Sequence, residues 1–226
     1  MSTITDTPLD RAGLLELLAR PQPPTRFERC TFDDEDLSNL DLSGIQFEAC
    51  SLARTRLKSA ILTDTLWQRC KIGQGNFELA DLTVARFIAC DLHMSNWARS
   101  RLSSAHMEDC KLIGASFIEA RTLGLTLRHC PLVGANLRGL SFRKQHLDQL
   151  NLSDADLGGC DFRDARFSGG SLQGASLKGA QFHGADLRDT DIGNLTIHDL
   201  TTSLRGAILS SEQAEQLIAS LGVQVI

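Results

Sequence analysis

The chain has 226 residues, of which 42% are hydrophobic and 23% are charged, as is typical of a soluble globular protein with one sizeable core. No apolar run approaches the ~18 residues of a membrane span, and the first residues lack the features of a secretory signal, so no membrane contact is expected. Seven cysteines in such a chain suggest a reducing, cytoplasmic location.

The formal net charge of −5 conceals an uneven distribution. Residues 1–50 contain ten acids and four bases, residues 51–147 contain seven acids and fourteen bases, and residues 148–226 contain eleven acids and five bases. The chain is therefore acidic at both ends and basic in the middle. Nucleic-acid binding would also require exposed aromatic side chains on a basic face. Because the aromatic residues follow the inward pattern described below, no direct binding of nucleic acid is expected.

Residues 1–24 are predicted to form an N-terminal capping segment. Thr7, Pro8 and Asp10 have the order of a helix start, with a threonine cap, a proline at the first helical position and an acid at the third. The apolar stripe of this helix would consist of Leu14, Leu15 and Leu18. We therefore expect a short helix over residues 8–20 that covers the first turn of the structure that follows.

Residues 25–200 follow a period of five. From Phe27 to Ile197 in steps of five there are 35 positions, which we call the centre positions, and only Thr122 is not Phe, Leu, Ile, Met or Trp. All ten phenylalanines and both tryptophans of the chain fall on centre positions. The predicted core aromatic residues include Phe27, Phe47, Trp67, Phe87, Trp97, Phe117, Phe142, Phe162 and Phe182.

Two residues before each centre lies a second inward position, which is rich in Ala and contains all seven cysteines. Two residues after the centre, 19 of 35 positions are Gly, Asp or Asn, which tolerate the positive φ angles of tight corners. A period of five fits neither a helix nor a plain strand, but it fits a chain that turns a corner at every repeat. Four successive repeats then close one square coil. We therefore predict an all-β solenoid, a quadrilateral β-helix with coils about 4.8 Å apart and short N- and C-terminal helices.

Residues 201–226 are predicted to form a helix followed by a strand. Ser210 and Gln213 have the spacing of a capping box, and Gly222 is a natural residue to end the helix. The segment is too apolar to stay in water, so it either packs on its own last coil or also pairs with a second subunit. The second alternative assigns a homodimer interface to Leu217, Ile218, Leu221, Val223 and Val225.

The cysteines and histidines do not predict a catalytic or metal site. Six cysteines recur once in every four repeats and would form a column, in which parallel side chains suit neither a disulfide nor tetrahedral zinc. The six histidines fall on outward positions and cannot meet the buried thiols. No loop interrupts the repeat, so no cleft is expected, and no P-loop or Rossmann fingerprint is present. We therefore expect no enzyme activity, no catalytic residue, no metal and no cofactor.

The repeat resembles the pentapeptide-repeat family. Within it, ARTLGLTLRHCPLVGANLRGLSF (120–142) and DIGNLTIHDLTTSLRGAILSSEQAEQLIASLGVQVI (191–226) are similar to segments of the Qnr group, to which MfpA and AlbG are related. The resemblance implies a right-handed β-helix that dimerises through its C-terminus. It further implies a non-enzymatic protein that mimics DNA, binds DNA gyrase or topoisomerase IV, and protects it from poisons such as quinolone drugs or peptide toxins.

DNA mimicry requires carboxylates at a density comparable to that of DNA phosphates. If two C-terminal ends meet, the acidic segments of both subunits would form one acidic centre. Its predicted members are Asp148, Asp154, Asp156, Asp161, Asp164, Asp186, Asp189, Asp191 and Asp199. Qnr proteins also carry loops that this sequence lacks. Two further functions therefore stay open, namely plain inhibition of the topoisomerase and immunity to a different toxin.

The alternative function is a structural scaffold that binds a different protein through its flat faces. An exposed apolar strip across the middle of the chain would favour it. The outward apolar residues are Ile61, Leu66, Leu79, Val84, Ile88, Met94, Ile113, Ile118, Leu123 and Val133.

Overall fold

The computed structural model describes residues 2–193, 195 and 197–219. The chain divides into two compact units, residues 1–126 and 127–226, and this division falls inside the predicted solenoid. The elements are β1 (Thr3–Thr5), α1 (Arg11–Leu18), β2 (Arg26–Glu28), β3 (Gln46–Glu48), β4 (Leu66–Gln68), β5 (Arg86–Ile88), β6 (His106–Glu108), β7 (Thr126–Arg128), β8 (His146–Asp148), β9 (Arg166–Ser168), α2 (Ile197–Thr201) and α3 (Ser211–Ala219).

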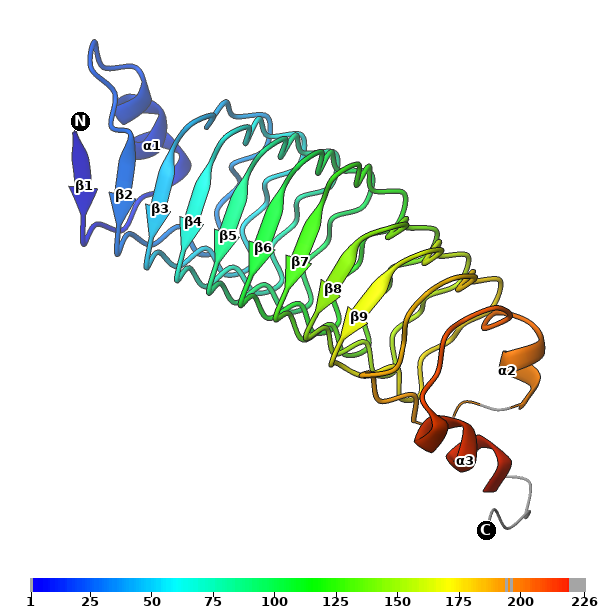
Figure 1. Ribbon diagram of the computed structural model, residues 1–226. Coiled ribbons are helices and arrows are strands. Elements are labelled where there is room, and N and C mark those ends of the chain that lie inside the picture. Colours follow the sequence, from blue (N-terminus) through cyan, green and yellow to red (C-terminus); the bar gives the residue numbers. More distant parts are fainter. Residues whose placement is uncertain (1, 194, 196, 220–226) are drawn as a thin grey trace. The chain divides into compact units, whose positions relative to one another are not determined.

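In the first unit, β1 to β6 lie side by side in one parallel sheet (Figure 1). From β2 onward each residue pairs with the one four repeats later, so that Phe27 lies beside Phe47 and Phe47 beside Trp67. The other three sides of the coil have the same register. Their ladders include Thr31↔Ser51, Asp36↔Arg56 and Asp41↔Ile61. Each coil therefore has four sides, with one repeat on each.

The second unit repeats this arrangement. His146 of β8 lies beside Arg166 of β9, and the remaining sides pair Asn151↔Ser171, Asp156↔Ser176 and Asp161↔Gln181. All of these pairings are parallel. The predicted β-solenoid with short helices is confirmed. None of the helices in the described part of the chain is long and apolar enough to cross a membrane.

The centre side chains fill the interior of the coils. The nine core aromatic residues named above are at most 3% exposed. In the first unit Trp67 stacks on Phe47, with ring centroids 4.1 Å apart, and Trp97 stacks on Phe77 at the same distance. In the second unit the stack runs from Phe142 to Phe162 at 5.1 Å and on to Phe182 at 4.6 Å. The register of four repeats thus places ring above ring in successive coils.

The two tryptophans explain why hydroxyl side chains occupy some inward positions. The indole Nε1 of Trp67 donates a hydrogen bond of 2.9 Å to Thr65, and that of Trp97 donates one of 2.7 Å to Ser95. Both hydroxyl residues lie two positions before the tryptophan, where Ala or Cys is common, and both are buried. A buried indole N–H needs an acceptor, so the small residue changes to Thr or Ser where the centre is Trp.

As predicted, the corner residue lies two positions after each centre residue. It is not always Gly, Asp or Asn, however. Gly44 and Gly134 adopt positive φ there, yet so do Leu79 at 60° and the β-branched Val84 at 55°. Side chains resist this conformation in isolation. The hydrogen bond from Val84 N to Ser103 O, 2.9 Å long, shows how the next coil holds the corner in place.

The N-terminal segment differs in detail from the prediction. Thr3–Thr5 forms β1 beside β2, and Pro8 bridges to Thr31, so the chain is still extended where a helix start was expected. Helix α1 begins later, with Asp10 as its N-cap, whose side chain accepts a hydrogen bond from Gly13 N at 2.8 Å. Because the residues up to Pro8 pair with the first coil, the helix does not begin at Thr7. In the helix, Leu14 and Leu17 are buried, whereas Leu15 is 43% exposed.

Candidate interaction surface

Four of the nine predicted surface carboxylates have a local structural role. Asp156, Asp161, Asp186 and Asp191 each precede a centre residue. Their Oδ1 atoms accept backbone N–H bonds from two residues ahead, at 2.9 to 3.3 Å. Asn151 makes the same contact with Ser153 N at 3.0 Å. Such Asx turns shape the corner, and Asn can replace Asp in them because only the oxygen is used.

Four of the nine carboxylates are also neutralised by neighbouring arginines, and a fifth, Asp148, pairs with a histidine that is charged only when protonated. The pairs are Asp161–Arg163 (2.7 Å), Asp186–Arg188 (2.7 Å), Asp156–Arg138 (3.2 Å), Asp148–His129 (3.2 Å) and Asp164–Arg143 (3.8 Å). The hydrogen bond from Arg188 lowers the pKa of Asp186 to about 2, and Arg163 likewise lowers the pKa of Asp161. The acidic charge of this segment is therefore smaller at the surface than the sequence count suggests.

The nine carboxylates do not share one face. By register, Asp148 and Asp186 lie on the side of the strands, Asp191 on the next side, Asp156 on the third and Asp161 on the fourth. Asp154, Asp189 and Asp191 form no ion pair with any residue that the structure describes, and all three are exposed. Asp186, Asp189 and Asp191 are the three of the nine that lie closest together in the sequence, on one side of the coil, the corner after it and the start of the next side.

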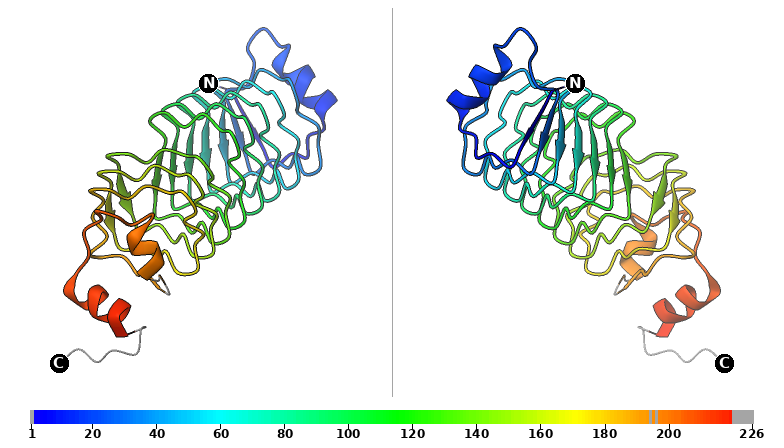
Figure 2. Two further views of the ribbon diagram at one scale, coloured as in Figure 1. Left: turned by 90° about the vertical axis from the view of Figure 1, so that its right-hand side faces the viewer. Right: turned by 90° about the vertical axis from the view of Figure 1, so that its left-hand side faces the viewer.

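The C-terminal cap lies against the same stretch of chain. The predicted capping box is confirmed, since Gln213 N donates to Ser210 Oγ at 3.2 Å and Ser210 N donates to Gln213 Oε1 at 2.8 Å. A further contact was not predictable from the sequence: Gln213 Nε2 donates to the carbonyls of Leu187 (2.8 Å) and Thr190 (2.7 Å). Both carbonyls lie between Asp186 and Asp191. Figure 2 shows α2 and α3 beyond the last coils of the second unit.

The predicted dimer residues that the structure describes differ in how far they are exposed. Leu217 is only 3% exposed within a single chain, which leaves it little surface for a partner, whereas Ile218 is 38% exposed. Of the two, Ile218 is therefore available for contact. Leu221, Val223 and Val225 lie outside the described residues. Within the described residues, Leu217 lies on the buried side of α3 and Ile218 on its exposed side.

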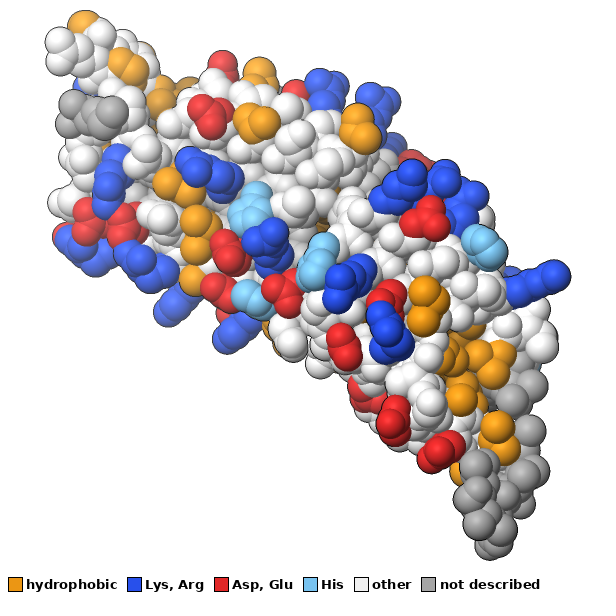
Figure 3. Space-filling view, viewed as in Figure 1, with side chains coloured by type: hydrophobic (Ala, Val, Ile, Leu, Met, Phe, Trp, Pro, Cys, Tyr) orange, Lys and Arg blue, Asp and Glu red, His pale blue; other side chains and the backbone are white. Residues whose placement is uncertain are grey.

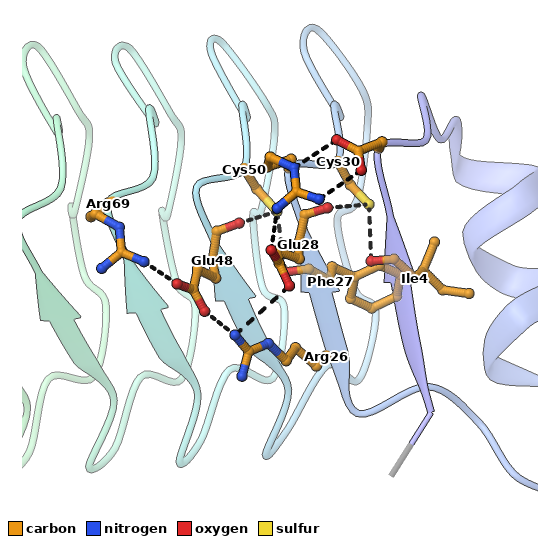
Figure 4. Close-up of polar contacts among 10 residues, drawn as sticks. Ile4, Arg26, Phe27, Glu28, Cys30, Glu48, Cys50 and Arg69 are labelled. Atoms are coloured by element: carbon orange, nitrogen blue, oxygen red, sulfur yellow. Dashed lines mark hydrogen bonds and ion pairs between the residues drawn. The ribbon is translucent and has the colours of Figure 1, made fainter.

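The basic middle of the sequence forms ion pairs between coils. Many basic residues lie one coil away from an acid on the same side. These pairs are Arg54–Asp34 (2.6 Å), Arg56–Asp36 (3.3 Å), Lys58–Glu78 (3.1 Å) and Arg101–Asp81 (3.0 Å). Glu48 accepts from both Arg26 and Arg69, which links three coils (Figure 4). Opposite charges four repeats apart are a sequence signal that could have predicted these contacts, since such residues stack on the same side.

The outward apolar residues of the first unit do not form one continuous strip. Ile61, Leu79 and Met94 belong to three different sides of the coil, with exposures of 44%, 45% and 62%. Leu123, next to the exceptional Thr122, is 84% exposed. On the face shown in Figure 3, hydrophobic side chains stand in small groups among charged ones. The exposed apolar residues of the first unit therefore give little support to a scaffold function.

All seven cysteines are buried as thiols. The six histidines are at outward positions, as in His93, which pairs with Asp91 at 2.7 Å. Within the described ranges, no three His, Cys, Asp or Glu side chains gather in a way that could hold a metal ion.

Comparison with known proteins identifies the repeat. A model described as "Pentapeptide repeat region" matches residues 25–97, and one described as "Pentapeptide repeats (8 copies)" matches residues 80–118, 127–164 and 160–194. No curated protein sequence matches the chain significantly.

Several solved structures share the fold. A trypsin-treated variant of QnrB1, a plasmid-mediated fluoroquinolone resistance protein, is 23% identical, with a TM-score of 0.67 over 99% of this chain and 97% of that one. Full-length QnrB1 is 24% identical, with a TM-score of 0.64 over 98% and 97%. HetL, involved in heterocyst differentiation regulation in the cyanobacterium Nostoc sp. strain PCC 7120, is 21% identical, with a TM-score of 0.54 over 90% and 98%. Together with the repeat models, which cover more than half of the sequence, these likenesses show that the chain belongs to the pentapeptide-repeat family.

Proposed function

We propose that this protein is a non-enzymatic, DNA-mimicking partner of DNA gyrase or topoisomerase IV that modulates the enzyme or protects it from topoisomerase poisons. The observation that carries the proposal is the likeness in fold to QnrB1 over nearly the whole length of both chains. The likeness includes the C-terminal part that follows the repeat. It supports a role as an interaction protein in which the surface, and no pocket, meets the partner.

The electrostatic part of the proposal rests on Asp186, Asp189 and Asp191. These side chains flank the two carbonyls that anchor Gln213 of α3. If two subunits meet through α3 and the residues that follow it, both copies of this acidic group come close to the junction. Arg188 offsets one of the three charges in each chain. Two chains would then present about four negative charges near the junction to a cationic surface that normally receives DNA.

The decisive experiment measures gyrase affinity for the triple variant Asp186→Asn, Asp189→Asn, Asp191→Asn at low and high salt. Asn retains the Asx-turn oxygen at the first and last of these positions, so the fold should persist. We expect weaker binding with a smaller salt dependence, because screened charge–charge attraction is removed.

A matched control removes three charges elsewhere. Asp34→Asn, Asp36→Asn and Asp41→Asn change outward carboxylates of the first coil, two of which also form Asx turns. The net charge changes equally, so equal losses in both variants would indicate a nonspecific effect of charge. Unchanged affinity of the first variant at both salt concentrations would contradict mimicry. It would favour the scaffold function, which also agrees with the pairing of four of the carboxylates with arginines.

The homodimer is tested separately at Ile218. Ile218→Asp places a charge on the exposed side of α3 and leaves the buried Leu217 intact. We expect sedimentation to show monomers, with the thermal midpoint of the β-helix unchanged. Glu215→Gln, on an exposed part of the same helix, is the control. A dimer that survives Ile218→Asp would show that α3 does not form the interface. A supercoiling assay with and without ciprofloxacin then distinguishes protection of gyrase from plain inhibition.

A further inference from the structure

The cysteines of the first unit form a regular column whose spacing is set by the backbone. Cys30, Cys50, Cys70, Cys90 and Cys110 occupy the same inward position in successive coils, and each is at most 1% exposed. The carbonyl of each of the first four accepts an N–H from the next coil at 2.9 Å. Figure 4 shows Cys30 and Cys50 at equivalent places of neighbouring coils. Successive side chains are therefore held parallel, about 4.8 Å apart.

The thiols of this column are oriented alike. Cys50, Cys70 and Cys90 each donate from Sγ to the backbone oxygen of the residue 23 positions earlier, in every case at 3.4 Å. Each sulfur also lies near backbone carbonyl oxygens; Cys50 Sγ, for example, is 3.4 Å from the oxygens of both Phe27 and Glu48. These oxygens surround the column with negative partial charge, which disfavours a bare thiolate and favours a cation beside the sulfur.

The spacing excludes a disulfide but matches another covalent arrangement. A disulfide requires sulfurs about 2.05 Å apart with converging Cβ atoms. A metal–thiolate bond is about 2.3 Å long in zinc sites, so two collinear bonds of that length separate their sulfurs by about 4.6 Å. That is close to the coil spacing of about 4.8 Å. Soft d¹⁰ ions that accept two ligands in a line therefore fit between neighbouring sulfurs, where a tetrahedral ion does not.

Charge selects among the soft ions. The column lies in an apolar interior, where an uncompensated charge is costly. Cu(I) or Ag(I) with two thiolates gives a complex of charge −1, whereas Hg(II) with two thiolates gives a neutral one. We propose that neighbouring cysteines of this column bind Hg(II) as a linear dithiolate. Two S–H bonds break, two Hg–S bonds form, two protons leave to solvent, and no atom is oxidised or reduced.

The proton balance has a measurable consequence. The interaction with Cys50 and burial raise the pKa of Cys70 to about 12, so this thiol is protonated before the metal arrives. The same interaction lowers the pKa of Cys50. At a pH below the pKa values of both thiols, two released protons per ion make the apparent affinity rise about a hundredfold per pH unit. An ion held by one thiol and a solvent ligand releases one proton, and its affinity rises only about tenfold per unit. Proton release therefore distinguishes the linear site from adventitious thiol labelling.

The test uses two triple variants that retain four cysteines each. Cys50→Ala, Cys90→Ala and Cys130→Ala leave no two cysteines in adjacent coils. Cys30→Ala, Cys110→Ala and Cys160→Ala leave Cys50, Cys70 and Cys90 in sequence. Alanine is common at this inward position, as at Ala60 and Ala80, so both variants should fold. Circular dichroism and thermal unfolding before metal addition establish this.

Because the thiols are buried, each protein is refolded from denaturant with mercuric chloride, and excess metal is removed with a small monothiol. We expect the wild type and the variant with neighbouring cysteines to retain mercury, with two protons released per ion and a raised thermal midpoint. The variant without neighbours should lose its mercury to the monothiol. One proton per ion in the wild type, or equal retention by both variants, would overturn the proposal. The outcome does not depend on the proposed function, since no gyrase is involved.

Discussion

Replacement of Phe87 by alanine should be among the most damaging single changes in the first unit. The ring is fully buried. It stacks on Trp67 at 5.6 Å, and it meets Trp97 at 5.5 Å and Phe77 at 6.1 Å edge to face. A buried Phe→Ala change costs about 3–5 kcal/mol, and each aromatic pair contributes about 0.5–1.5 kcal/mol beyond its buried area. Three such pairs place the expected loss near the upper end, at about 5 kcal/mol.

The coil gives the site little freedom to collapse around the cavity. The backbone of β5 and of the residue after it is hydrogen-bonded to the coils on both sides, with Arg86 N donating to Thr65 O at 2.9 Å and Ala89 N donating to Glu108 O at 2.9 Å. Neighbouring coils therefore cannot move inward without losing these bonds. The part of the destabilisation that comes from the empty cavity should therefore not be reduced by relaxation of the surrounding coils.

Equilibrium unfolding in urea, followed by tryptophan fluorescence, measures the effect directly, because both tryptophans contact Phe87. Phe87→Leu restores a side chain common at centre positions and should cost no more than about 2 kcal/mol. Arg86→Ala, on the exposed side of β5, should change stability by about 0.5 kcal/mol or less. A loss below about 1 kcal/mol for Phe87→Ala would refute the account of a close-packed aromatic interior.

Three further predictions concern a corner, a carboxylate and the thiols. Gly170→Ala should cost at least about 2 kcal/mol more than Gly134→Ala, because its Cβ would lie 2.1 Å from Leu150 O whereas that of Gly134 meets nothing within 4 Å; urea unfolding measures both. Arg188 lowers the pKa of Asp186, so this ion pair should stabilise the fold above the unfolded pKa of about 4 and lose its effect as pH falls toward about 2. The stability difference between wild type and Asp186→Asn should therefore shrink between pH 4 and pH 2, and a constant difference would contradict this. All seven thiols should react slowly with a thiol reagent until denaturant is added, and rapid native labelling of several would argue against their burial.

The coil and its interior could be predicted from the residues alone. A centre side chain in a narrow shaft has to be apolar in every turn, so a five-residue period with a single exception at Thr122 specified which large residues are inside. The same reasoning placed the thiols in a column, since residues four repeats apart stack. The capping box at Ser210 was also readable, because a helix start depends on residues only three positions apart.

The roles of the outward residues became clear only from the folded chain. Val84 takes a left-handed corner against its own preference because the hydrogen bonds of the next coil hold it there. Asp186 counts as one negative charge in the sequence, yet Arg188 neutralises it and its oxygen shapes a turn. Gln213 looks like a capping residue, but its amide also anchors α3 to the last coil. These roles depend on which groups stacking brings within a few ångströms, and for outward residues many sequences are compatible with the same coil.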